Sequence, residues 1–204
     1  MREEGRGERR AGREVGRGKR LCRIQGPILK VLIAGETFRS SVVELVSCRL
    51  PKWFPVAPPD VGSIDWAAVR AVLLAVSPAW STACAKTWLG GWVTDTRLQN
   101  PDRRCVLGCP ARCSLKHYFR CPLFRALVER MTPGPLPLAP LEALALLSPS
   151  PSRIRVVALM FQIHRLLHAH RDPSSPQVSS SVALSIAKAA RRAVDLHRPP
   201  EEGA

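Results

Sequence analysis

The sequence predicts a mainly α-helical protein. Apolar residues recur at helical spacing in segments that begin at capping residues such as Ser77 and Ser152. The chain has 204 residues and 46% hydrophobic content, so it can bury one core. Nineteen prolines and thirteen glycines divide it too often for one long scaffold. We therefore expect a small helical domain built from short elements.

The N-terminal third is the least regular part. Residues 1–20 are mostly Arg, Gly and Glu with little to bury, which predicts a disordered basic tail. Residues 28–50 contain short apolar runs that fit two strands, or a strand and a helix. The prolines from Pro51 to Pro59 indicate a linker-like break. We accordingly divide the chain into this tail, an uncertain linker-like part at 21–60, and a helical domain at 61–200.

Helix signals follow one another through the domain. Ser63 or Asp65 can cap a buried helix at 66–76. Ser77-Pro78 begins a second helix that runs to residue 88, and Gly90-Gly91 ends it. Trp88 and Trp92 are predicted to be core residues.

The second half of the domain continues the pattern. A helix reaches residue 130, and Pro122 kinks it or splits it in two. A short helix is expected at 141–147, a strong one from its Ser152 cap to residue 170, and a last one at 183–197. His164 and His168 share one helix face, which we interpret as a solvated or pairing face and not as a ligand set.

Five potential metal ligands stand at a spacing of four: Cys105, Cys109, Cys113, His117 and Cys121. Gly108 and Pro110 oppose one continuous helix through them. A Cys-x3-Cys turn that closes on a short helix carrying the last two ligands would let four donors converge. We predict that Zn²⁺ staples segment 105–121 through Cys105, Cys109, His117 and Cys121. Cys113 is a spare thiol or replaces Cys105; ordinary buried thiols are the other interpretation.

Positive charge surrounds this segment. The net charge is +15, and residues 97–130 carry eight bases against two acids. Such a field favours nucleic acid through phosphate contacts, RNA or DNA, although a high Arg content can also reflect a GC-rich genome. The predicted phosphate contacts are Arg97, Arg103, Arg104, Arg112, Lys116 and Arg120.

Several functions are disfavoured. There is no phosphate-binding Gly-rich loop, no Gly-x-Ser-x-Gly elbow and no Asp-Asp pair, so we expect no enzyme and no small-molecule substrate. No stretch reaches the 18 apolar residues of a membrane span. The uneven set of seven cysteines does not fit a secreted disulfide framework. We expect an intracellular, nuclear protein.

Residues 86–125 resemble a known family. Lys86-Thr87-Trp88-Leu89-Gly90-Gly91-Trp92-Val93-Thr94-Asp95-Thr96-Arg97 precedes the Cys-x3-Cys turn and the later His-Tyr-Phe-Arg-Cys-Pro. This resembles the Cys/His zinc segment after the polymerase domain of non-LTR retrotransposon reverse transcriptases, which are RNA-directed DNA polymerases. The resemblance implies the same four zinc ligands and a preceding element formed by Trp92, Thr94 and Arg97. The family's aromatic-x-Asp-Asp turn is absent here.

Together these features predict a non-catalytic, zinc-binding, nucleic-acid-binding fragment of such a reverse transcriptase. Two alternatives remain open: a small helical zinc module that binds another protein, and a decayed reading frame that folds poorly. Nucleic-acid binding that survives removal of the local bases would favour the protein-interaction module. Little helix with or without zinc would favour the decayed frame.

Overall fold

The structure is a computed structural model that describes residues 35, 42–54, 58–94, 104–171 and 177–198. Within these residues the chain is helical and forms no β-strand beyond one isolated bridge. The prediction of a mainly α-helical protein is confirmed. The predicted disordered tail at 1–20 lies outside the described residues.

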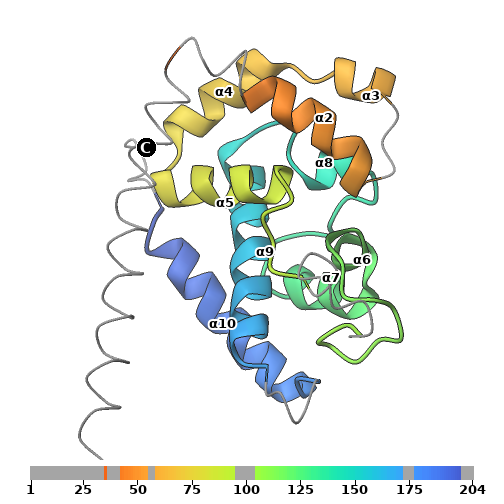
Figure 1. The fold of residues 1–204 in the computed structure, drawn as a ribbon. Helices are drawn as coiled ribbons and strands as arrows, with labels where there is room; N and C mark the ends of the chain where they lie inside the picture. Colours follow the sequence, from red (N-terminus) through yellow and green to blue (C-terminus); the bar gives the residue numbers. More distant parts are fainter. Residues whose placement is uncertain (1–34, 36–41, 55–57, 95–103, 172–176, 199–204) are drawn as a thin grey trace, which may run out of the picture.

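A central helix organises the domain. Helix α9, Pro151–Ala169, runs through the middle of the molecule (Figure 1). It packs most extensively against α5, Pro78–Trp88, and α10, Ser180–Asp195. The other helices surround this trio: α2 and α4 lie on one side, and α6 and α7 on another (Figure 1). One continuous apolar core joins residues from all these helices.

Helix α2, Glu44–Trp53, decides between the two alternatives for the N-terminal part and corrects one expectation. Residues 44–50 are helical, which agrees with the alternative of a strand and a helix, whereas Pro51 lies inside this helix instead of opening a linker. Val46 and Leu50 stand four positions apart and are both fully buried, so core packing compensates for the hydrogen bond that proline cannot donate. A short helix follows, α3, Pro58–Gly62.

Side-chain caps fix where the next two helices begin. Asp65 caps α4, Trp66–Ala75, by accepting hydrogen bonds of 3.0 Å from the N–H groups of Ala67 and Ala68. Ser77 caps α5 by accepting from the Trp80 N–H at 3.4 Å, and Pro78 stands at the first helical position. Both capping predictions are confirmed, since each side chain accepts from N–H groups in the first turn of its helix.

Two helices end in the same backbone motif. After α5, Gly90 has φ +68°, its N–H donates to Thr87 O, and the Gly91 N–H donates to Lys86 O. After α8, Pro140–Ala143, Ala145 adopts φ +59° with the equivalent pair of hydrogen bonds. These are Schellman ends, which pair the last carbonyls of a helix. The second one explains why α8 stops short of the predicted residue 147.

The last two helices begin earlier than predicted. Ser150 caps α9 by accepting from the Arg153 N–H at 3.3 Å, and Pro151 is the first helical residue. The prediction that Ser152 is the cap is therefore wrong; Ser152 lies within the first turn. Ser179 caps α10 in the same way. In each case a serine upstream of the predicted start accepts a hydrogen bond from an N–H group of the first turn.

Three buried tryptophans tie the core together through their indole N–H groups. Trp88 donates to Leu144 O at 3.1 Å, and Trp80 donates to Val194 O at 3.0 Å. Trp92 donates to the Thr87 hydroxyl at 2.9 Å. A buried indole is stable when its N–H has a partner. The prediction that Trp88 and Trp92 are core residues is confirmed.

Candidate metal centre

The first half of the centre is a tight loop. Arg104 and Arg112 form an isolated antiparallel bridge, and the Cys105 N–H donates to Ala111 O at 3.0 Å. Between them the Gly108 N–H donates back to Cys105 O at 3.0 Å. Gly108 has φ +87°, a conformation that favours glycine. This turn brings the first two cysteines, Cys105 and Cys109, to the same side of the loop.

The loop is also anchored from outside. The Val178 N–H donates to Val106 O at 2.8 Å, so the segment before α10 holds the loop backbone. Gln177 lies against the glycine of the turn: a Cβ on Gly108 would stand 3.2 Å from its Oε1. Val106 itself is fully buried. These contacts give the loop a defined position over the core.

The second half is a helix boundary. Ser114 caps α6, Leu115–Arg120, by accepting from the His117 N–H at 3.2 Å. Cys121 follows directly and is at once the last cap of α6 and the first cap of α7, Pro122–Glu129. The helix thus ends one residue before Cys121, which was predicted to lie on it. The long helix predicted to reach residue 130 is divided in two at Pro122, which is one of the two predicted outcomes.

The four donor atoms of Cys105, Cys109, His117 and Cys121 converge. They all lie within 4.8 Å of one another. Sulfur–sulfur distances are 4.0 Å between Cys105 and Cys121, and 3.8 Å between Cys109 and Cys121. A tetrahedral zinc ion with ordinary bond lengths requires about 3.8 Å between two sulfurs and about 3.6 Å between sulfur and nitrogen. These two sulfur edges already have the size of the edges of a zinc tetrahedron.

One edge of the cluster is shorter than that tetrahedron. Cys109 Sγ and His117 Nε2 are 2.9 Å apart, a hydrogen-bond distance. An ion would widen this edge by roughly 0.7 Å to reach the distance above. Both residues are half-buried and lie at the outer side of the cluster, whereas Cys105 and Cys121 are buried. The adjustment therefore falls on the side of the site that has room.

The two buried thiols differ in acidity. The hydrogen bond from Cys105, and after it the Phe124 backbone N–H at the start of α7 and the nearby His117, together lower the pKa of Cys121 to about 5. The same hydrogen bond, followed by burial, raises the pKa of Cys105. Burial also raises the pKa of Cys109. One thiolate is thus present at neutral pH, and a metal ion would displace the remaining protons.

Cys113 belongs to a different cluster. Its sulfur is fully buried, 3.5 Å from the Tyr118 hydroxyl and 3.7 Å from His168 Nε2. The Tyr118 hydroxyl and His168 Nε2 are 2.9 Å apart. The structure therefore brings Cys105, and not Cys113, together with the other donors. Among the described residues no second group of metal-ligating side chains occurs.

The α9 histidines were predicted to form a solvated or pairing face. The solvated alternative is wrong for His164, which is 1% exposed, whereas His168 Nε2 pairs with the Tyr118 hydroxyl at 2.9 Å. The His164 ring stacks with that of His168 at 4.3 Å and with that of Trp92 at 4.4 Å between centroids. The reason is that α9 is the central helix and has core neighbours on several sides. The adjacent apolar residues Ile163 and Leu167 were the signal in the sequence that this face is buried.

The predicted phosphate contacts are only partly described. Arg104, Arg112, Lys116 and Arg120 are exposed on the loop and on α6. Arg104 and Arg112 face each other across the bridge, which brings two positive side chains together. Arg97 and Arg103 lie outside the described residues. The exposure of these side chains does not by itself demonstrate binding to nucleic acid, so their contact with phosphates stays a prediction.

Fold and cluster together define a helical protein with a three-cysteine, one-histidine group that could hold a metal ion such as zinc. Comparison of the chain with protein-family models, curated proteins and solved structures gives no significant match. The resemblance to reverse transcriptases thus stays a prediction that rests on the residues quoted above. Within the described residues no helix is long and apolar enough to cross a membrane.

Proposed function

We propose that this protein binds one structural zinc ion and uses the basic surface around it to bind nucleic acid without catalysis. The proposal rests on the convergence of the donor atoms of Cys105, Cys109, His117 and Cys121 within 4.8 Å. Exposed Arg and Lys side chains surround this cluster. A centre that fixes a loop against two helices also fixes the positive side chains on them.

The donor set favours zinc over other common cations. Thiolate and imidazole ligands suit zinc, whereas magnesium and calcium take oxygen ligands. Four protein ligands leave no position for a reacting water, which is typical of a structural site. When bound, zinc would supply coordination bonds between the loop and the α6–α7 boundary, and in zinc-finger peptides such sites contribute about 10–16 kcal/mol to folding at neutral pH.

The basic surface supports nucleic acid as the partner. Arg104 and Arg112 are adjacent, and Lys116 and Arg120 stand four positions apart on α6, so they share a helix face. Cations held at fixed positions release counterions when they contact phosphates, which gives affinity without reading bases. In this proposal the chain is a fragment of a reverse transcriptase, as the resemblance implies. Trp92 and Thr94, which precede the metal-ligand segment in the sequence, are buried. They would support the metal-ligand segment by packing.

The zinc proposal predicts one tightly bound zinc per chain. Cys109→Ser and Cys121→Ser should each lose most of the metal and the helical signal of α6 and α7, because removing one ligand leaves an incomplete tetrahedron. Elemental analysis of purified protein and circular dichroism measure both effects. Cys48→Ser is the control, since Cys48 is exposed on α2. Equal zinc content in all variants would contradict the assignment of the ligands.

The nucleic-acid proposal predicts salt-dependent binding. Replacing Arg104, Arg112 and Lys116 by Gln should weaken binding to a mixed-sequence duplex or single strand. It should also lower the slope of log K against log salt by about 2 to 3, because each lost phosphate contact contributes about 0.7 to 0.9. Fluorescence anisotropy at several salt concentrations measures this.

The matched control removes the same charge elsewhere: Lys188, Arg191 and Arg192 on α10 become Gln. That control should retain most of the slope. Unchanged binding in the first variant, with zinc and helix content intact, would remove the proposed surface and favour a protein-interaction module. Weak helical signal with and without zinc would favour a decayed reading frame.

A further inference from the structure

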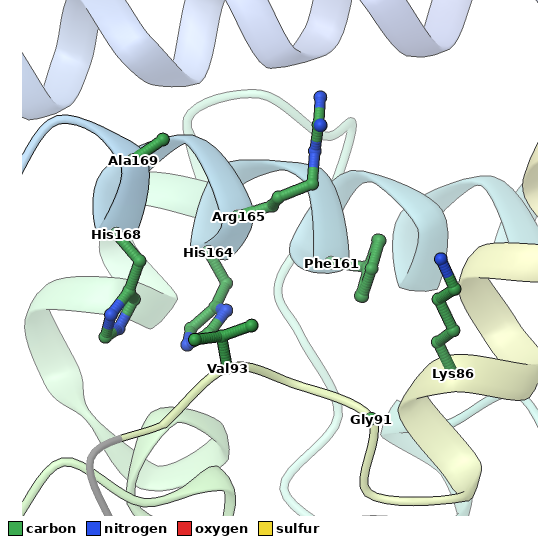
Figure 2. A pocket seen from close by; sticks show the side chains of 8 residues that line it. All are labelled: Lys86, Gly91, Val93, Phe161, His164, Arg165, His168 and Ala169. Carbon is green, nitrogen blue, oxygen red and sulfur yellow. The ribbon is translucent and has the colours of Figure 1, made fainter. Parts of the chain in front are cut away.

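The molecule has a cavity that is separate from the metal cluster and has no role in the proposed function. It holds about 540 Å³ and lies between α9, the end of α5 and the segment after it (Figure 2). Cavities that bind small molecules typically measure about 300–1,000 Å³ and combine apolar walls with a few polar groups. Its walls include Val93, Phe161 and Ala169, and its polar groups include Lys86 and His164.

The unusual group in this cavity is His164. The residue is 1% exposed, and its Nε2 atom has no hydrogen-bond partner. Figure 2 shows the imidazoles of His164 and His168 projecting from the same side of α9 toward Val93. Buried polar atoms in native proteins nearly always have a partner, so an orphaned nitrogen at a cavity wall indicates a ligand that supplies one.

The His164 ring is also held in place. It lies between Trp92 and His168, with centroid distances of 4.4 and 4.3 Å, and contacts the Tyr118 ring at 4.7 Å. Burial, and then the neighbouring His168, lowers the pKa of His164. The ring is therefore neutral at physiological pH, with one nitrogen that donates and one that accepts. Such a ring recognises an uncharged polar edge and not an anion.

The other side of the cavity offers a flat surface and a charge. Phe161 is half-buried, and Lys86 Nζ lies 5.8 Å from its ring centroid. Lys86 forms no ion pair with any acid among the described residues. Arg165 also borders the cavity, but its Nε donates to Gln162 Oε1 at 3.1 Å. The ammonium thus lies over one face of the Phe161 ring and leaves the other face for a ligand.

The neutral imidazole of His164, the aromatic ring of Phe161 and the ammonium of Lys86 together fit one class of ligand. A heterocyclic base can stack on the Phe161 ring and offer its hydrogen-bonding edge to a neutral imidazole. The phosphate attached to its sugar would then lie within reach of the ammonium. An apolar ligand would leave both polar groups unused, and a simple anion would leave the aromatic wall unused.

We propose that this cavity binds a nucleotide unit, with the base against Phe161 and His164 and the phosphate toward Lys86. The choice of a nucleotide rests in part on the nucleic-acid function proposed above, because a strand held at the basic surface would supply such units. The same chemistry could come from a free mononucleotide, and the experiment below separates the two sources.

The experiment uses the full zinc-loaded chain, labelled with ¹⁵N in its five histidines. Long-range ¹H–¹⁵N spectra report the hydrogen bonding of each imidazole nitrogen, and His164→Phe assigns the resonance. The chain is titrated separately with AMP, with adenosine and with a single-stranded deca-adenylate. Saturable AMP binding that shifts His164 Nε2 is expected. A shift with the decamer identifies a strand unit; a shift with AMP alone identifies a free nucleotide.

Two variants and one control test the contacts. His164→Phe keeps a ring between Trp92 and His168 but removes the hydrogen bond, and should weaken AMP binding about tenfold. Lys86→Met should weaken binding of AMP by about tenfold while leaving adenosine unchanged, since only AMP carries the phosphate. Lys188→Met, on α10, should change neither.

The results that would overturn the inference differ from those that would overturn the proposed function. The nucleotide site is removed, even when nucleic acid binds, if the His164 resonance is unmoved by AMP and by the decamer. It is also removed if both variants bind AMP as tightly as the native chain does. Loss of salt-dependent binding with AMP still shifting His164 removes the nucleic-acid function and leaves a site for free nucleotides.

Discussion

Single residues in this protein carry two tasks at once. Cys121 ends one helix, caps the next, and places its sulfur 3.8 and 4.0 Å from two other thiols. Its position at the start of α7 also favours the thiolate, because the Phe124 backbone N–H donates toward the sulfur. His164 has a comparable double role: it fills the core between Trp92 and His168 and borders a cavity.

Burial of His164 predicts a pH dependence of stability. The folded state holds this ring neutral, whereas the unfolded ring takes up a proton below its ordinary pKa of 6.5. The unfolded state therefore binds more protons in acid, and the free energy of unfolding should fall as pH drops below about 6.5. The slope from this residue approaches about 1.4 kcal/mol per pH unit.

Urea unfolding of the native chain and of His164→Phe between pH 5 and 7.5 measures this contribution. The variant lacks the titrating group, so its stability should fall less steeply in acid. Acid-induced loss of metal affects both proteins and cancels in the difference. Parallel pH profiles would show that the His164 ring is not held neutral in the folded state.

Helix ends determine the shape at the scale of elements. Two Schellman motifs turn the chain after α5 and after α8, and each places one residue at positive φ. At the first turn this residue is Gly90, and an added Cβ would stand 2.6 Å from the indole of Trp53. At the second it is Ala145, which is fully buried at φ +59°. The same motif is thus relaxed in one place and strained in the other.

The two turns give a matched pair of substitutions. Gly90→Ala should lower the free energy of unfolding by at least about 1–2 kcal/mol, from the left-handed backbone, with the Trp53 contact adding to it. Ala145→Gly should raise it by up to about 1 kcal/mol, since the relieved strain exceeds the added flexibility of glycine. Chemical denaturation measures both. Similar effects of the two substitutions would show that the turns are not equivalent motifs.

The elements also show what the sequence can predict. Ser77, Asp65 and Pro122 set helix boundaries through local chemistry, and those boundaries were predictable. The choice of Ser150 over Ser152 depends on which side chain reaches the free amides first, and spacing alone does not reveal it. The linker-like break expected at Pro51 was wrong because long-range burial of Val46 and Leu50 outweighs the local cost of a proline.

At the scale of the whole molecule, one core carries two separate sites. The spacing of Cys105, Cys109, His117 and Cys121 predicted the donor cluster, because ligands close in sequence need only a turn to meet. The cavity beside His164 was not predictable, since its walls come from residues as far apart in sequence as Lys86 and Ala169. Only the packing of α5 on α9 brings them together.

Because the metal cluster and the packing of α5 on α9 involve different residues, removing the metal should affect only part of the molecule. Chelation should increase hydrogen–deuterium exchange in residues 104–129, where the donors and the two helices beside them lie. Exchange in α5 and α9 should change much less, because their extensive mutual packing does not involve the cluster. Mass spectrometry of peptic peptides measures both regions. A uniform rise along the described helices would instead mean that the metal supports the entire core.

The backbone hydrogen bond between Val106 and Val178 has a consequence for synthesis. The donor residues leave the ribosome first, and the anchor that holds their loop is translated much later. A growing chain can therefore present all four side chains to cellular metal while the loop still lacks its fixed position. Binding of a metal ion would then precede the final docking of α10, and metal supply during translation, and not only after it, would influence the folding yield.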